Sequence, residues 1–270
     1  CRDSNNPDAL DLSKGFNIVV GGNTLGRGIT FPHLQTVYYC RSSKMPQADT
    51  FWQHSRIFGY DREKELVRIY IPRTLHSLFV SLNEANEILI KQIENGIENI
   101  QVIYPNGIKP TRKNVLDNQY LNMIVGGANM FANNPISQYT KDIDSIVEQY
   151  INTEYSDVSA EILIKILKLT GSSVHSDFDS NKYIACIKAL QEKRPTIKYR
   201  LIVRTNRDIS KGTGTLLSPT DRRLGDSFKN DITLTIYRVN GSTDKGWDGS
   251  PLWIPNIKFP DGICFYNIDE

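Results

Sequence analysis

The stretch NIVVGGNTLGRGITFPHLQTVYYC, residues 17–40, joins two apolar runs through a glycine-rich loop. The runs at residues 17–20 and 36–40 consist mainly of β-branched and aromatic residues, which favour strands. Residues 21–30 of the loop contain neither an acidic residue nor a histidine, so the loop brings no group for acid–base chemistry. Its glycines let backbone amides approach a ligand, and its arginine offers a charged fork. The composition predicts an anion site, although an ordinary turn with a solvated arginine has the same composition.

Strands and helices alternate over the first hundred residues. Residues 47–58 contain neither proline nor glycine and predict a helix, and residues 66–71 predict a third strand. Apolar residues recur at three- and four-residue steps between residues 75 and 93, which indicates an amphipathic helix. The alternation predicts an α/β sheet for residues 1–105, and ligands bind at the carboxyl edge of such sheets.

The rest of the chain changes character twice. Apolar periodic segments follow the helix N-cap candidates Thr140, Ser159 and either Asp179 or Ser180, so residues 106–195 predict a helical region. Residues 197–204 alternate between apolar and basic residues, which predicts a half-solvated strand. Further strands are expected at residues 231–239, 252–259 and 263–268. Residues 196–270 therefore predict a β-rich C-terminal region.

Composition limits the classes of function. The chain has 270 residues, of which 32 are basic and 30 acidic, and its net charge is +2. The net charge therefore does not indicate a protein whose whole surface attracts nucleic acid. Its four cysteines and four histidines show no metal-ligand spacing, so we expect no metal site and a reduced, cytoplasmic compartment. We find neither a signal peptide nor an apolar run long enough to span a membrane. Because the chain begins with Cys1 instead of methionine, we expect it to be a piece of a longer protein.

A second segment, FWQHSRIFGYDRE at residues 51–63, carries Gln53 and Arg56 one helical turn apart, so both project from one face. Together with the loop at residues 21–30, this segment resembles motifs V and VI of the second RecA-like lobe of superfamily-two helicases. More specifically, IVVGGNTLGRGITF, RSSKM, QHSRIFGYDRE and RIYIP are similar to the Z-one domain endonuclease family. The late segment GWDGSPLWIPNIKFP is similar to the C-terminal part of that family.

The resemblance implies a RecA-like helicase C-terminal lobe that forms one wall of a nucleotide site. It implies that Arg56 contacts a phosphate, and Arg62 is the next candidate for an arginine finger. The expected nucleotide-binding residues are Gly21, Gly22, Arg27, Gly28 and Gln53. Two departures from the helicase pattern are Ser55, where motif VI has glycine, and Thr30, where many helicases have aspartate.

The phosphate-binding loop GxxxxGK(S/T) is missing from the sequence. Residues 210–218, SKGTGTLLS, have the glycines, but the lysine precedes them and we expect no strand before them. A missing N-terminal ATPase lobe would therefore supply that loop and the metal-binding acid. We expect ATP and Mg²⁺ to bind to the intact parent protein, and the isolated chain to bind neither and to be inactive.

A local nucleic-acid surface is a further candidate. Arg222, Arg223 and Lys229 fall in a predicted loop between strands, and the nearby basic residues are Lys198, Arg200 and Arg204. A solvated loop is the alternative. Trp247 and Trp253 are candidates for base stacking, with packing under a loop as the alternative.

Acidic segments at residues 7–14, 175–182 and 259–262 hold parts of a nuclease pattern but no complete one, and Asp179 suits an N-cap better. The sequence therefore leaves three functions, in decreasing order of support. The first is part of an ATP-dependent DNA-processing enzyme of the restriction or defence type, with DNA and the missing lobe as partners. The second is a non-catalytic scaffold or interaction module with a degenerate helicase lobe. The third is a free-standing metal-dependent nuclease.

Overall fold

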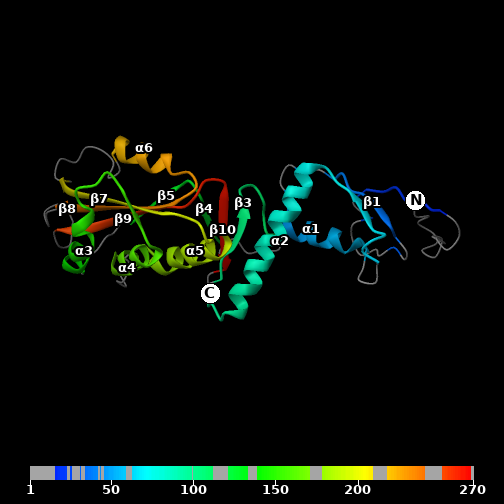
Figure 1. Ribbon diagram of the computed structural model, residues 1–270, viewed down its shortest axis with the longest axis horizontal. Helices are drawn as coiled ribbons and strands as arrows, with labels where there is room; N and C mark the ends of the chain where they lie inside the picture. The colour runs from blue at the N-terminus through cyan, green and yellow to red at the C-terminus, as the bar shows by residue number, and fades with distance from the viewer. Residues whose placement is uncertain are drawn as a thin grey trace. The chain divides into compact units, whose positions relative to one another are not determined.

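The computed structural model describes residues 16–22, 25, 31, 34–41, 43, 46–58, 63–98, 100–111, 121–132, 139–170, 178–208, 218–240 and 251–268. The chain forms two compact units (Figure 1), each composed of two chain segments. Unit 1 comprises Cys1–Val80 and Gly107–Val115, and unit 2 comprises Ser81–Asn106 and Leu116–Glu270. Among the helices in these ranges, none is long and apolar enough to cross a membrane.

Unit 1 contains a strand–helix–strand arrangement. Strand β1 (Thr36–Tyr38) pairs in parallel with β2 (Arg68–Tyr70), and helix α1 (Ala48–Ser55) with the 3-10 turn η1 (Arg56–Phe58) connects them. A helical crossover is the usual way to join two parallel strands. The strands expected near residues 36–40 and 66–71 and the helix expected at 47–58 are confirmed.

The strand expected at residues 17–20 is wrong. These residues adopt no regular structure, and the side chains of Ile18 and Val20 are 91% and 83% exposed. β-branched side chains favour strands chiefly when they pack on a pleated, half-buried surface, and here they lack such packing. Sequence preference alone therefore does not form this strand.

Residues 107–111 return to the start of α1. The backbone N–H groups of Ala48 and Asp49 donate to the carbonyls of Lys109 and Pro110, at 2.9 and 3.1 Å. The Thr111 hydroxyl donates to the Asp49 carboxylate at 2.8 Å. The first N–H groups of a helix have no hydrogen-bond acceptor within the helix. The returning segment supplies acceptors for two of these groups in α1.

Unit 2 is built on a five-stranded sheet in the order β5–β9–β8–β7–β6. Its strands are β5 (Asn129–Phe131), β6 (Ser156–Val158), β7 (Tyr199–Asp208), β8 (Ile232–Asn240) and β9 (Leu252–Lys258). Strands β7 and β8 are parallel, and the other neighbours are antiparallel. A second, antiparallel sheet contains β3 (Val102–Pro105), β10 (Ile263–Ile268) and β4 (Leu121–Val125).

Helices cover both faces of the five-stranded sheet (Figure 1). On one face lie α3 (Thr140–Val147) with the 3-10 turn η2 (Glu148–Tyr150), α4 (Ala160–Thr170) and α5 (Ser180–Lys193). On the other face lies α6 (Pro219–Ser227). Helix α2 (Arg73–Glu94) contributes its first residues to unit 1 and the remainder to unit 2. The helices expected after Thr140, Ser159 and Asp179 are confirmed.

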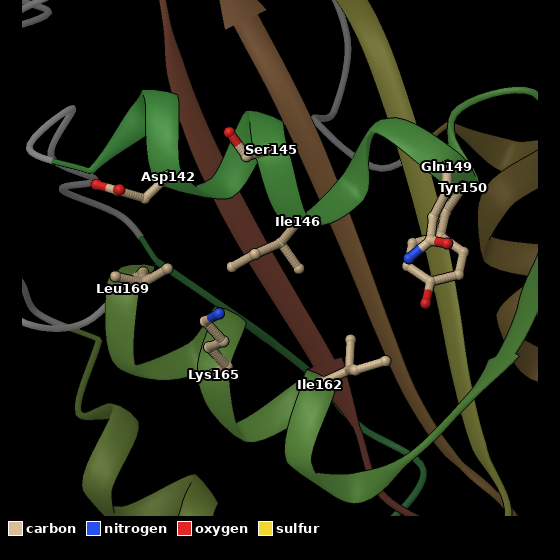
Figure 2. A pocket seen from close by; sticks show the side chains of 8 residues that line it. All are labelled: Asp142, Ser145, Ile146, Gln149, Tyr150, Ile162, Lys165 and Leu169. Carbon is tan, nitrogen blue, oxygen red and sulfur yellow. The ribbon is translucent and has the colours of Figure 1, made fainter.

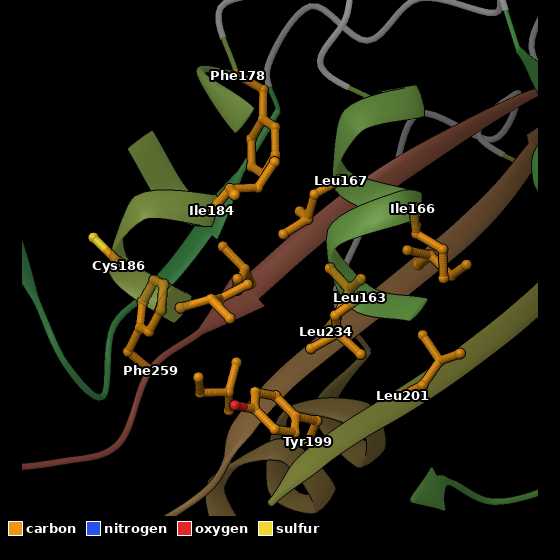
Figure 3. Packing of buried hydrophobic residues seen from close by; sticks show 14 of the residues in the cluster. Leu163, Ile166, Leu167, Phe178, Ile184, Cys186, Tyr199, Leu201, Leu234 and Phe259 are labelled. Carbon is orange, nitrogen blue, oxygen red and sulfur yellow. The ribbon is translucent and has the colours of Figure 1, made fainter. Parts of the chain in front are cut away.

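The main core of unit 2 lies between this sheet and helices α4 and α5. Figure 3 shows Leu163 and Leu167 of α4 near Leu201 and Leu234 of the sheet, and all four are at most 1% exposed. Each buried leucine contributes about 1.5–3 kcal/mol relative to leaving it in water. Helical and β-rich parts thus share one core.

Three sequence expectations about β7 and α6 are wrong. Residues 219–227, expected as loop, form α6, which begins with Pro219 after the N-cap Ser218, whose hydroxyl accepts from the Asp221 N–H at 3.1 Å. Strand β7, expected to be half-solvated, is covered on this side too, and Ile202 is completely buried. A strand also precedes residues 210–218, because β7 runs to Asp208. A serine N-cap followed by proline is a helix-start signal.

The division into residues 1–105, 106–195 and 196–270 stays a prediction. Compactness groups the chain differently, because residues 81–106 fall in unit 2 and residues 107–115 in unit 1. Strands β4, β5 and β6 also lie in the region expected to be helical, where each pairs with a longer strand of the C-terminal half.

Candidate functional site

The glycine-rich loop is described at its first residues. The Leu25 N–H donates to the Gly22 carbonyl at 3.2 Å, which closes a turn. A Cβ on Gly21 would lie 2.5 Å from the Leu25 side chain, whereas a Cβ on Gly22 would meet no atom within 4 Å. Packing inside the turn accounts for Gly21, and the space beside Gly22 is open. Arg27, Gly28, Thr30 and Arg62 lie outside the described residues.

Gln53 and Arg56 are both exposed, at the end of α1 and the start of η1. Their three-residue spacing in a helical segment places them on the same side, as the sequence predicts. Within the part of unit 1 that the structure describes, no carboxylate lies within 4.0 Å of Arg56. The Arg56 guanidinium is therefore not committed to an ion pair there.

His54, for which the sequence indicated no role, contacts two other side chains in unit 1. His54 is 5% exposed, with Tyr39 Oη 2.8 Å from its Nδ1 and Arg41 Nη1 2.9 Å from its Nε2. Arginine can only donate, so Nε2 accepts, and the ring is the neutral Nδ1–H tautomer that donates to Tyr39. Its position three residues after the buried Phe51 was the sequence signal for this burial.

Tyr39 connects this contact to the apolar side of α1. Its ring packs edge-on against His54 and Phe79, with centroids 5.7 and 5.8 Å apart, and Phe79 packs in the same way on Phe51. Burial raises the pKa of Tyr39, and the nearby Arg41 charge partly opposes this. The phenol therefore stays neutral at physiological pH and remains a hydrogen-bond partner of His54.

The basic residues of unit 2 that the sequence predicts to bind nucleic acid fall into two groups, those that are exposed and those that form ion pairs. Arg222 and Arg223 are exposed on α6, and Lys229 is exposed just beyond its end. By contrast, Arg200 pairs with Asp157 and Asp231, and Arg204 pairs with Asp221. The predicted nucleic-acid surface therefore loses two of its arginines to ion pairs.

Asp221 is the buried centre of the network under α6. Its carboxylate accepts from Arg204 Nε at 2.8 Å, Arg207 Nη2 at 2.6 Å, Ser218 Oγ at 2.8 Å and Tyr237 Oη at 3.3 Å. Burial would raise the pKa of Asp221, but the hydrogen bonds from Arg204 and Ser218 and the two arginine charges hold the pKa below its ordinary value. The carboxylate is therefore ionised and fixes the start of α6 to the sheet.

Trp253, a candidate for base stacking, and Asp179, from one of the acidic segments, both have structural roles. Trp253 is 2% exposed, and its Nε1 donates to Asp144 at 2.8 Å, so it packs instead of presenting a stacking face. Trp247 lies outside the described residues. Asp179 caps α5 by accepting from the Lys182 N–H. In the described ranges, no three His, Cys, Asp or Glu side chains are grouped to hold a metal ion.

A groove of about 500 Å³ lies between α3 with η2 and α4. Figure 2 shows Ile146 and Ile162 projecting into it, with Asp142 and Lys165 nearby. The other lining residues are Ser145, Gln149, Tyr150 and Leu169. The Ser145 hydroxyl, which could be a nucleophile, donates to the Lys141 carbonyl at 3.1 Å instead of to a base of the groove.

Known protein families match both parts of the chain. Residues 124–261, just over half of the chain, match the model described as the restriction endonuclease CglI H-subunit, C-terminal domain. Residues 2–114 match the Z1 domain model. A solved structure, the C-terminal domain of the CglI restriction endonuclease H subunit, is 30% identical with a TM-score of 0.43 and covers 51% of this chain and 99% of its own. No curated protein matches the chain.

Proposed function

Because the chain belongs to the family defined by the C-terminal domain of the restriction endonuclease CglI H-subunit, we propose that it is part of an ATP-dependent restriction enzyme. In this proposal unit 1 is the second, RecA-like lobe of a helicase-type motor. The Z1 match over residues 2–114 and the parallel β1–α1–β2 arrangement support the assignment. In this proposal a first lobe binds ATP and Mg²⁺, and DNA is the substrate.

The observation that carries the proposal is the exposed guanidinium of Arg56 beside Gln53 at the end of α1, with no carboxylate partner among the described residues. When the γ-phosphate of ATP is transferred to water, negative charge is stabilised by cations placed before the reaction begins. An arginine without a carboxylate partner is available for this role. Arg56 therefore acts on a nucleotide that the first lobe holds.

The test is ATP turnover by the full-length parent protein. Arg56→Ala should reduce turnover about a thousandfold or more, as removal of an arginine finger does. Arg56→Lys should restore little, because a point charge does not reproduce the planar fork. Arg68→Ala is the matched control, since Arg68 lies at the amino end of β2 and donates to the carbonyls of Glu65 and Val67. Normal turnover by Arg56→Ala would favour the scaffold function instead.

DNA contact is assigned in the same proposal to the exposed basic residues of α6 and its end. In the described part of unit 2, no carboxylate lies within 4.0 Å of Arg222, Arg223 or Lys229. Surface cations without an acidic partner can neutralise backbone phosphates and release the counterions that surround DNA. This contact is independent of sequence, and it positions the protein without specifying bases.

A further inference from the structure

We propose that Arg41 is a second residue of unit 1 that contacts a phosphate of the bound nucleotide, and that His54 positions its guanidinium. The inference rests on the proposed nucleotide site and adds a binding residue to it. Arg41 comes three residues after the end of β1, a strand that pairs in parallel with β2. Ligands in α/β sheets bind outside the carboxyl ends of parallel strands. The chain therefore places this guanidinium at the edge where a nucleotide would lie.

Among the described residues, the charge of Arg41 lacks an acidic partner. The side chain is partly buried, and the hydrogen bond at its Nη1 goes to a neutral imidazole nitrogen. No carboxylate within the described ranges approaches Arg41 to 4.0 Å. Removing a charge from water without a counter-charge is costly. A bound anion would supply that counter-charge.

A nucleotide phosphate suits the remaining donors. A guanidinium has five N–H groups in a planar fork, and the contact with His54 uses one of them. The others can bind two oxygens of one phosphate in parallel, which is the geometry that arginine forms with phosphates. Arg41 thus has N–H groups left to bind a phosphate while its Nη1 is held by His54.

His54 is a positioning residue in this arrangement. Its ring is buried, its Nδ1–H is engaged by Tyr39, and its Nε2 is left as an acceptor directed at Arg41. A flexible arginine loses rotational freedom when it binds a ligand, and a contact formed beforehand reduces that loss. His54 therefore increases the affinity of Arg41 for the phosphate without touching the ligand.

The experiment measures equilibrium binding of Mg-ATP and of duplex DNA to the full-length parent protein, together with its unfolding temperature. Arg41→Ala should weaken ATP binding about tenfold to a hundredfold, the range for a hydrogen bond to a charged group. His54→Phe keeps a ring but removes the acceptor, and should weaken ATP binding less. The double variant should bind ATP no more weakly than Arg41→Ala, because His54 acts through Arg41. Arg68→Ala is the control and should bind ATP normally.

Four outcomes would overturn the inference. If Arg41→Ala binds ATP normally while Arg56→Ala loses turnover, Arg41 is not a nucleotide contact although the proposed function stands. If Arg41→Ala weakens DNA binding and leaves ATP binding unchanged, the phosphate belongs to DNA. If His54→Phe lowers the unfolding temperature but not ATP affinity, His54 is structural. Normal ATP binding and turnover by both arginine variants would remove the nucleotide site itself.

Discussion

The arginines of the two units differ in what they contact. Four arginines of unit 2 lie within 4.0 Å of an aspartate, and these are Arg200, Arg204, Arg207 and Arg238. In the described part of unit 1, neither Arg41 nor Arg56 has a carboxylate at that distance. An arginine with a fixed acidic partner stabilises the fold, whereas one without such a partner can bind a ligand. The contrast separates arginines that the fold pairs with an aspartate from arginines that are available to a ligand.

Replacing Asp221 tests the structural side of the contrast and should have the largest effect on stability. Asp221→Ala leaves the partly buried charges of Arg204 and Arg207 without their carboxylate, and breaking such a pair costs about 3–5 kcal/mol. Hydrogen exchange of the β7 and β8 amides measures the loss within unit 2. Asp157→Ala is the control, because that side chain is 62% exposed and its loss should cost under about 1 kcal/mol. Equal losses of stability in Asp221→Ala and Asp157→Ala would mean that the Asp221 ion pairs are no more structural than an exposed ion pair.

The stability contributed by the Asp221 carboxylate should depend on pH and be lost in acid. The folded-state pKa of Asp221 is lowered, so its contribution is fully present above the unfolded value of about 3.9 and is lost as pH falls through the folded pKa. The free energy of unfolding should therefore fall more steeply between about pH 5 and pH 2 in the natural protein than in Asp221→Asn. Titrating stability by denaturant at several pH values measures this, and parallel curves would mean that Asp221 is not held ionised.

The exposed cations of α6 lie between the two classes, because they belong to unit 2 but lack acidic partners in the described ranges. Arg222→Ala combined with Arg223→Ala should weaken DNA binding and make it less sensitive to salt. Each lost phosphate contact changes the logarithmic slope by about 0.9, so the pair should change it by about 1.8. Lys165→Ala with Lys168→Ala on α4, across the sheet, should leave the slope unchanged. An unchanged slope for the arginine pair would leave α6 as solvated surface.

Arg56 should show the smallest effect on stability. Its side chain is exposed and has no acidic partner in the described ranges, and substitutions at such positions change the free energy of unfolding by about 0.5 kcal/mol or less. Hydrogen exchange of the β1 and β2 amides reports on unit 1. A loss above about 1 kcal/mol in Arg56→Ala would mark a structural arginine and would break the comparison between the units.

Helices and strands with a clear local pattern were predicted from the sequence. Elements that form because of the segments packed beside them were missed. The alternation at residues 197–204 indicated β7, the β-forming residues at 231–239 indicated β8, and the run without proline or glycine indicated α1. Helix α6 was missed because its nine residues include few apolar ones, although Ser218 and Pro219 gave a start signal. The short strands β4 and β5 form because β10 and β9 lie beside them, which local pattern does not reveal.

The candidate site was predictable to the extent that it depends on helical spacing. The positions of Gln53 and Arg56 followed from one turn of helix. The contact of Arg41 with His54 did not, because it depends on where β1 ends relative to α1, across thirteen residues. The same limit explains the predicted basic surface, in which Arg204 is neutralised by Asp221, seventeen residues away on a helix that was taken for loop.

The return of residues 107–111 to the start of α1 has an evolutionary consequence. Recombination that exchanged unit 1 at residue 105 would separate Asp49 from Thr111, and the first turn of α1 from the carbonyls that it uses. A hybrid gene would then encode a first unit without one of its own segments. The two units are therefore expected to have been inherited together, with sequence exchange confined to boundaries beyond Thr111.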